Sequence, residues 1–108
     1  MVYWITGRAN SGKTTLAHKI AAQINGVVLD GDDIRRVFPA GYDRKDRRAH
    51  QLRLMKLARV LHGHGVNVVV ACVSPDKKYR RLLQKLLKEC VEIQLPFGEL
   101  WEGTEYEE

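Results

Sequence analysis

The residues best suited to chemistry lie near the N-terminus, where two glycines bracket a short run that ends in a lysine and a threonine. Gly7-Arg8-Ala9-Asn10-Ser11-Gly12-Lys13-Thr14 fits the P-loop pattern G-x-x-x-x-G-K-[ST] at every position. Glycines let the backbone curl so that successive amides point inward, and the N-terminus of the following helix adds partial positive charge to this anion site. We therefore predict binding of a nucleoside triphosphate, ATP or GTP.

Within this loop, two side chains have separate predicted roles. Lys13 is expected to reach the β and γ phosphates, and the hydroxyl of Thr14 is expected to hold Mg²⁺. The alternative interpretation is a tight turn between strand and helix with a solvated lysine. The predicted nucleotide-binding residues are Gly7, Arg8, Ala9, Asn10, Ser11, Gly12, Lys13, Thr14 and Thr15.

A second polar group, Asp30-Gly31-Asp32-Asp33, follows a short apolar run. A carboxylate at the end of a strand can face the γ-phosphate, hold Mg²⁺ or its water, and accept a proton from an attacking hydroxyl. We predict Asp32 as the first choice for this base and Asp30 as the second, with Asp32 also binding the metal beside Thr14. In the alternative interpretation, Asp32 or Asp33 only caps the helix that follows.

Strands and helices alternate around both groups. The spacing of apolar residues predicts a strand over 2–6, a helix over 13–24 that ends at Asn25-Gly26, and a short buried strand over 27–29. A short helix is then expected from Asp32 to about Phe38. A long helix follows and ends at Gly63 and Gly65.

The second half of the chain continues the alternation. Val66–Val73 is interrupted only by Asn67 and is otherwise apolar on both faces, which predicts a strand in the middle of a sheet that is covered on both sides by helices. Ser74 as the N-cap and Pro75 as the first helical residue are expected to open a last helix, and residues 91–95 predict a fourth strand. In that helix the expected apolar face is Tyr79, Leu82, Leu83, Leu86 and Leu87, and the expected solvated face is Lys77, Lys78, Arg80 and Arg81.

This alternation predicts the α/β class, as the three-layer P-loop NTPase fold with a short parallel sheet of about four strands flanked by helices. Ligands of such sheets bind outside the carboxyl ends of the strands. Gly7, Asp30 and Ser74 all follow predicted strands, so we expect them to meet in one crevice. The length suits a single domain over 1–108, in which 96–108 form an acidic tail.

Composition narrows the class of protein. The chain is 44% hydrophobic and 29% charged, which is typical of a soluble globular protein, and its net charge of +5 would attract polyphosphates or sulfate esters. Nucleic acid is the least favoured partner, because the basic residues lack interleaved aromatic residues. Without a signal peptide or an apolar run long enough to span a bilayer, we expect a cytoplasmic protein with no membrane contact. Cys72 and Cys90 are expected to be buried thiols, and His62 and His64 solvated imidazoles rather than a metal pair.

The chain resembles the adenylylsulfate kinases in the order and approximate spacing of several motifs. These are Trp4-Ile5-Thr6-Gly7 with the P-loop, Asp30-Gly31-Asp32 with Ile34-Arg35, Gly41-Tyr42 with Asp46-Arg47, and Val73-Ser74-Pro75. The resemblance covers about the first 95 residues. It implies an ATP-dependent phosphotransferase that acts on an alcohol group, with the γ-phosphate passing to the 3′-hydroxyl of adenosine 5′-phosphosulfate.

The resemblance also implies which residues bind the acceptor. Arg35 and Arg47 would contact the phosphosulfate, and Tyr42 stands where a phenylalanine stacks on the substrate adenine. Val73 and Ser74 would lie at the substrate site. His50 takes the place of an asparagine in the family's Asp-Arg-x-x-Asn run, which changes one substrate contact. Taken singly, each of the two arginines is more often a solvated helix charge, and only their arrangement with the P-loop favours a contact with substrate.

One family segment is missing from the pattern. The family continues after the fourth strand with a mobile lid that carries arginine and lysine, whereas residues 100–107 already resemble a later stretch, as if the lid were deleted between Leu95 and Leu100. Loss of a finger-type arginine can cost about 10³ to 10⁵ in rate. Arg8, or an arginine from a second subunit of a homo-oligomer, could substitute. Two alternatives therefore stay open: a kinase for another nucleotide or small hydroxyl acceptor, and a nucleotide-binding module with little catalysis.

Overall fold

The computed structural model describes residues 1–8, 11–73, 76–87 and 90–95. Within these residues, four strands and four helices follow one another in the order β1 (Val2–Gly7), α1 (Lys13–Ile24), β2 (Val27–Asp30), α2 (Gly31–Val37), α3 (Arg44–Gly63), β3 (Val68–Ala71), α4 (Lys77–Leu86) and β4 (Cys90–Leu95). The strands form one sheet in the order β2-β3-β1-β4, and each neighbouring pair is parallel. The predicted α/β class with a four-stranded parallel sheet is confirmed.

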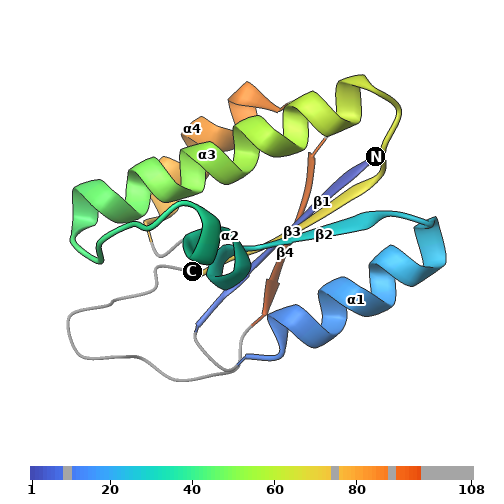
Figure 1. Cartoon of the computed structure of the whole chain (residues 1–108), viewed down its shortest axis with the longest axis horizontal. Coiled ribbons are helices and arrows are strands. Elements are labelled where there is room, and N and C mark those ends of the chain that lie inside the picture. The colour runs from blue at the N-terminus through green and yellow to red at the C-terminus, as the bar shows by residue number, and fades with distance from the viewer. Residues whose placement is uncertain (9–10, 74–75, 88–89, 96–108) are drawn as a thin grey trace.

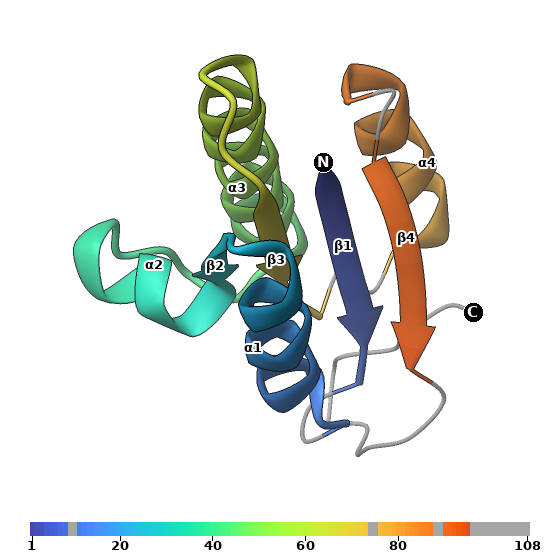
Figure 2. The same cartoon turned by 90° about the vertical axis from the view of Figure 1, so that its right-hand side faces the viewer.

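Helices cover both faces of the sheet. Figure 1 shows α3 and α4 on one face and α1 on the other, and Figure 2 shows the sheet between them. Successive side chains of a strand point to opposite faces, so each strand contributes to two cores. Trp4 and Val70 pack with Leu54 of α3 and Leu83 of α4, whereas Ile5 packs with the other core. That second core, on the α1 side, contains Ile5, Ala17, Ala21, Val69 and Ala71.

β3 lies between β2 and β1, as its apolar sequence predicts. All four of its residues are buried, because helices cover both of its faces. The strand is shorter than the predicted run of 66–73. The residue before it, Asn67, uses its side-chain amide to donate to the carbonyl oxygen of Ile24 at 2.8 Å, and thereby ties the start of β3 to the end of α1.

The last helix differs from the prediction in where it begins. α4 starts at Lys77, and Asp76 is its N-cap, with a carboxylate that accepts from the amide of Tyr79. An aspartate that bonds the third amide of a helix is a common start signal, so the helix needs no cap from Ser74. Ser74 and Pro75 lie outside the described residues.

Two residues of α4 also occupy the opposite environment from the one predicted. Leu82, expected in the apolar face, is 55% exposed, whereas Arg80, expected in the solvated face, is 1% exposed. Leu83 and Leu87 are buried as predicted. The apolar face is therefore narrower than the leucine pattern suggests, and a buried arginine borders it because Glu92 of β4 provides a partner.

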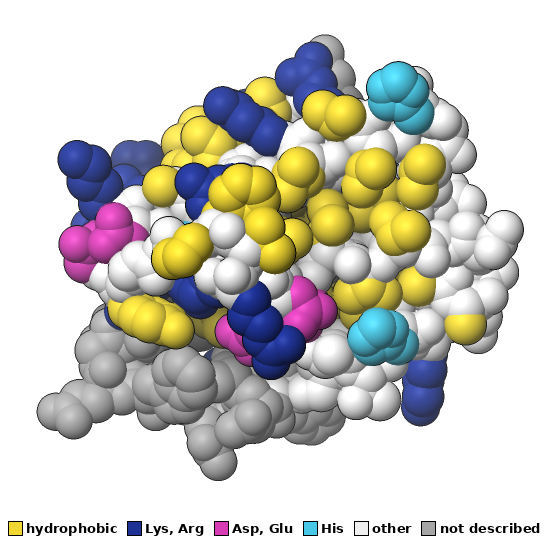
Figure 3. Space-filling model, in the orientation of Figure 1, with side chains coloured by type: hydrophobic (Ala, Val, Ile, Leu, Met, Phe, Trp, Pro, Cys, Tyr) yellow, Lys and Arg dark blue, Asp and Glu magenta, His cyan; other side chains and the backbone are white. Residues whose placement is uncertain are grey.

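The surface shown in Figure 3 is the face bordered by β2, an edge strand of the described sheet. Hydrophobic side chains gather across its middle, and Val27 of β2 is 43% exposed. None of the helices in the described part of the chain has the length and apolar character needed to cross a membrane. The predicted acidic tail, 96–108, lies outside the described residues.

Candidate active site

The P-loop glycines lie at the end of β1 and just before α1, since Gly7 is the last residue of β1 and Gly12 is the N-cap of α1. Gly7 has φ +153°, and a Cβ at this position would lie 3.0 Å from the carbonyl oxygen of Leu95. Gly12 has φ +91° and precedes the first residue of α1. Both conformations disfavour a side chain, so the glycines of the motif are required by the backbone that the structure has. Ala9 and Asn10 lie outside the described residues.

Lys13 turns back over this loop. Its Nζ donates to the carbonyl oxygen of Arg8 at 2.7 Å and lies 3.5 Å from the hydroxyl oxygen of Ser11. Burial lowers the pKa of Lys13 from its ordinary value, and the nearby carboxylates of Asp32 and Asp30 oppose that shift. The ammonium group therefore lies between Arg8 and Ser11, on the two described sides of the loop, and its predicted contact with phosphates stays a prediction.

Thr14 and Asp30 form the contact between the P-loop helix and β2. The hydroxyl of Thr14 donates to Oδ2 of Asp30 at 2.8 Å, and Asp30 is 8% exposed. The other carboxylate oxygen, Oδ1, accepts from the amides of Asp32 at 2.9 Å and Asp33 at 3.4 Å. Asp30 is therefore the N-cap of α2, a role that the alternative interpretation of the sequence gave to Asp32 or Asp33. The side chain of Asp32 is exposed, and Thr15 is exposed on α1.

The ends of the central strands meet beside this contact. Gly7 and Asp30 are the last residues of β1 and β2, which both run parallel to β3 and so end at the same edge of the sheet. The amide of Gly7 donates to the carbonyl oxygen of Val73 at 3.5 Å, so the residue two positions after β3 borders the P-loop. Gly7 and Asp30 therefore lie at the same edge of the sheet, as predicted from the strand ends, whereas Ser74 lies outside the described residues.

Two residues implied to bind the acceptor already contact each other. The guanidinium of Arg35, on α2, lies 4.4 Å from the centroid of the Tyr42 ring, and Tyr42 is 61% exposed. The Nε of Arg35 is buried and has no hydrogen-bond partner among the described residues. This cation–π pair presents an aromatic surface and a cation together, which suits a ligand with a planar base and an anionic group. Arg47 is half-buried in the first turn of α3.

His50, the fourth residue implied to bind the acceptor, has another contact. It is 3% exposed, and its Nε2 lies 2.9 Å from the carbonyl oxygen of Gly31. Burial, followed by the charge of Arg35, lowers the pKa of His50 from its ordinary value. Its imidazole therefore faces the start of α2, next to Asp30.

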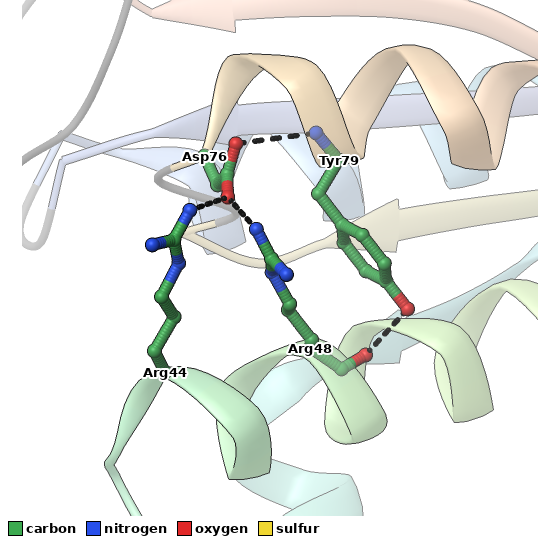
Figure 4. A network of polar contacts seen from close by, with 4 residues as sticks. All are labelled: Arg44, Arg48, Asp76 and Tyr79. Atoms are coloured by element: carbon green, nitrogen blue, oxygen red, sulfur yellow. Dashed lines mark hydrogen bonds and ion pairs between the residues drawn. The ribbon is translucent and has the colours of Figure 1, made fainter.

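A network that the sequence analysis did not identify joins the beginnings of α3 and α4 (Figure 4). Asp76 Oδ2 accepts from the guanidinium groups of both Arg44 and Arg48, and the hydroxyl of Tyr79 donates to the carbonyl oxygen of Arg48 at 3.0 Å. The arginines and the amide of Tyr79 hold the pKa of Asp76 well below its usual range. The signal available in the sequence was an aspartate three residues before Tyr79, which is the spacing of an N-cap.

This network matters for the site because of where its members lie. Arg44 and Arg48 are on either side of Arg47 in the first turns of α3, and Asp76 follows the residues implied to lie at the substrate site after β3. Fixing α3 against α4 therefore also fixes the orientation of the turn that carries Arg47.

Comparison with known proteins gives a consistent result. The family model described as adenylylsulphate kinase matches residues 1–105. A protein of Aeropyrum pernix named probable adenylyl-sulfate kinase is 36% identical over 115 aligned positions, which cover 100% of this chain and 61% of that protein. The adenylyl-sulfate kinase of Myxococcus xanthus is 33% identical over 106 positions, which cover 93% of this chain and 56% of that protein.

A solved structure agrees with the sequence relatives. The APS kinase of Mycobacterium tuberculosis, in complex with AMPPNP and APS, has a TM-score of 0.77 and 27% identity to this chain, over 86% of this chain and 59% of that one. This chain thus spans less than two thirds of the length of these relatives. The match to the family model over residues 1–105, together with the motifs and their geometry, shows that the chain belongs to the adenylylsulfate kinase family.

Proposed function

We propose that this chain transfers the γ-phosphate of ATP to the 3′-hydroxyl of adenosine 5′-phosphosulfate. The observation that carries the proposal is the contact of Thr14 with Asp30, which joins the P-loop to the start of α2, the helix that carries Arg35. A phosphate site and an acceptor site are thereby linked through one short segment, as transfer between two bound substrates requires. The complex of the Mycobacterium tuberculosis relative with AMPPNP and APS supports this pair of substrates.

On the nucleotide side, we assign the positive groups to the phosphates. The loop amides and Lys13 would bind the β and γ phosphates, and Lys13 would exchange its bond to the Arg8 carbonyl for a bond to phosphate. Phosphoryl transfer depends mainly on positioning and on stabilising charge, and both are tasks of this loop. ATP is the assigned donor, and GTP is the alternative to be tested.

The residues present suit Mg²⁺, because the Thr14 hydroxyl and the Asp30 carboxylate already place two oxygen atoms 2.8 Å apart. Thr14 and an aspartate, Asp30 or Asp32, would hold the ion, with triphosphate oxygens and water as the other ligands. When bound, Mg²⁺ neutralises charge on the β and γ phosphates. The bond between Thr14 and Asp30 favours Asp30 for this position and leaves the exposed Asp32 to accept the proton of the attacking hydroxyl.

On the acceptor side, we assign the adenine of the acceptor to the exposed ring of Tyr42 and the phosphosulfate to Arg35 and Arg47. The contact of Arg35 with Tyr42 supports this assignment, because one ligand could engage the ring and the guanidinium together. Val73 borders the P-loop and would line the space between the two substrates.

The proposal is tested with labelled ATP and a panel of hydroxyl acceptors, in which adenosine 5′-phosphosulfate should be phosphorylated fastest. Lys13→Ala should abolish the transfer, whereas Lys19→Ala, which changes an exposed lysine of the same helix, should not affect it. Equal rates with unrelated nucleotides would favour a kinase for another acceptor. ATP binding without transfer to any acceptor would favour a nucleotide-binding module, and either result would remove the primary proposal.

Matched substitutions distinguish the proposed roles of Asp30 and Asp32. Asp32→Asn should lower kcat by about 10²- to 10⁴-fold while ATP affinity changes little, as expected for loss of a general base. Asp30→Asn should weaken Mg²⁺-dependent ATP binding as well, because it changes the partner of Thr14. The opposite pattern, with ATP binding sensitive only to Asp32→Asn, would reverse the assignment.

A further inference from the structure

The contact between His50 and Gly31 defines how the imidazole is protonated. A carbonyl oxygen only accepts hydrogen bonds, so the Nε2 that lies 2.9 Å from the Gly31 oxygen must carry the hydrogen. In the neutral ring, Nδ1 then has a lone pair and no hydrogen. This Nδ1 is buried and has no hydrogen-bond partner among the described residues.

Gly31 sits in a crowded position between the end of β3 and α3. A Cβ on Gly31 would lie 3.3 Å from the Cβ of Cys72, 3.6 Å from the carbonyl oxygen of Ala71 and 3.6 Å from Nε2 of His50. Ala71 and Cys72 limit the movement of this peptide on one side, and His50 limits it on the other. The imidazole therefore fixes the first residue of α2 against the sheet.

The residue before Gly31 connects this contact to the P-loop. Asp30 uses one carboxylate oxygen to accept from Thr14 and the other to accept from the amides that start α2. A shift of the Gly31 peptide would move the backbone of Asp30 and those amides together. The path from His50 through Gly31 and Asp30 to Thr14 consists only of neighbouring residues and hydrogen bonds.

We propose that His50 is a positioning residue, whose Nε2–H group holds the Gly31 carbonyl and thereby keeps the Asp30 carboxylate against Thr14 of the P-loop. This role differs from the substrate contact that the family resemblance implies for position 50. With 3% exposure and Nε2 already bonded, the imidazole has little surface left for a ligand. The proposal rests on the proposed function, because the segment that His50 holds carries the nucleotide and acceptor residues.

The surrounding charges support a neutral ring. Burial opposes protonation of His50 most strongly, and the positive charges of Arg35 and Arg53 oppose it as well. Asp32 and the Gly31 carbonyl favour protonation, but the pKa of His50 is lowered on balance. An imidazolium would also place a second N–H, on Nδ1, in a buried position without an acceptor among the described residues.

Substitution of His50 by asparagine or glutamine distinguishes a positioning role from a direct contact with the substrate. The amide nitrogen of glutamine lies as many bonds from Cα as Nε2 of histidine, whereas that of asparagine corresponds to Nδ1. If His50 positions Gly31, His50→Asn and His50→Ala should lower kcat by about 10- to 100-fold with little change in the KM of the acceptor, and His50→Gln should restore most of the loss. His64→Asn, at an exposed histidine after α3, is the matched control and should leave kcat unchanged.

Two results would overturn the proposal. If His50→Asn keeps the wild-type kcat and changes only the acceptor KM, position 50 contacts the substrate directly. If all three variants lower kcat equally, or in proportion to their melting temperatures, the role of His50 is merely structural.

The test also works if the proposed function fails. Should the wild type transfer no phosphate to adenosine 5′-phosphosulfate, calorimetry of Mg²⁺-ATP binding replaces the rate measurement. Binding should weaken about tenfold in the Asn and Ala variants and recover in the Gln variant. In addition, ¹⁵N NMR of the His50 ring should show Nε2–H with an unprotonated Nδ1 at pH 7, and an Nδ1–H tautomer or an imidazolium would refute the proposal.

Discussion

Arg80 provides a direct test of the packing between α4 and β4. Its side chain is 2% exposed, and its Nε lies 3.3 Å from Oε1 of Glu92, while Gln84 donates to the other carboxylate oxygen at 3.1 Å. Arg80→Met keeps most of the apolar stem and removes the charge. The variant leaves Glu92 beside the core without its cationic partner, and this loss should destabilise the native state.

The size of the effect follows from the burial of the pair. Removing one partner of a buried ion pair costs about 3–5 kcal/mol, and the lower end applies here because the Glu92 side chain is 20% exposed. For a domain near this size, each kcal/mol lowers Tm by about 4–8 °C, so a loss of about 3 kcal/mol corresponds to about 12–24 °C. Adding Glu92→Gln should recover part of this loss, because the uncompensated charge is then removed.

Thermal unfolding followed by circular dichroism measures the effect. Arg81→Met is the matched control, because Arg81 is the next residue and is exposed, so its free energy of unfolding should change by less than about 0.5 kcal/mol. If Arg80→Met melts within about 4 °C of the wild type, or if the double variant is no more stable than Arg80→Met, the energetic importance assigned to the pair is wrong.

Four further predictions concern the loop, the helix cap, pH and the thiols. Gly7→Ala should abolish ATP binding measured by calorimetry, because a Cβ would press on the Leu95 carbonyl oxygen at 3.0 Å in a backbone conformation that favours glycine. Asp76→Ala should cost about 1–2 kcal/mol in urea unfolding, whereas Asp76→Asn should cost less because asparagine also caps helices. Since the pKa of His50 is lowered in the folded state, the unfolded chain binds its proton more readily, so stability should fall as pH drops below 6.5, and His50→Gln should reduce this fall. Burial raises the pKa of Cys90 to about 12, so iodoacetamide at pH 8 should label Cys90 in the native protein at least about 100-fold more slowly than in urea, as followed by mass spectrometry.

Local sequence was sufficient to predict most of the fold. The P-loop and the apolar face of α1 depend on residues that are close in sequence, and the central position of β3 depends on burial from both sides. The spacing of apolar residues along the chain indicates helical faces and buried strands alike. Asn25, with φ 52° after α1, likewise has the left-handed conformation that its residue type favours. The predicted boundaries failed where two signals competed, as at α4, where Asp76 rather than Ser74 is the cap.

The errors inside the elements have a different origin. Arg80 was predicted on the solvated face because its neighbours in sequence are basic, but it is buried and forms an ion pair with Glu92, which belongs to another element. The cap of α2 was missed for the same reason, because the role of Asp30 depends on a partner in another element. Whether an aspartate caps α2 or faces the P-loop depends on where Thr14 lies after folding, and here one carboxylate does both. A pattern of residue types along the chain contains no information on such pairings.

The two halves of the site are consequently positioned by different means. The phosphate-binding half is a turn between a strand and its helix, and its glycines and lysine are within eight residues, so a motif identifies it. The acceptor half is the segment that runs from Asp30 through α2 to the first turns of α3, between β2 and β3. Contacts with other residues hold this segment in place: Thr14 binds Asp30, His50 binds Gly31, and Asp76 binds the first turns of α3. These contacts are polar, and the one at Asp76 involves both Arg44 and Arg48, whereas the P-loop is followed by a helix packed on the sheet. Substitutions at these three positions should therefore alter the geometry between the two substrates more than the affinity of either, and activity should be lost before the fold is.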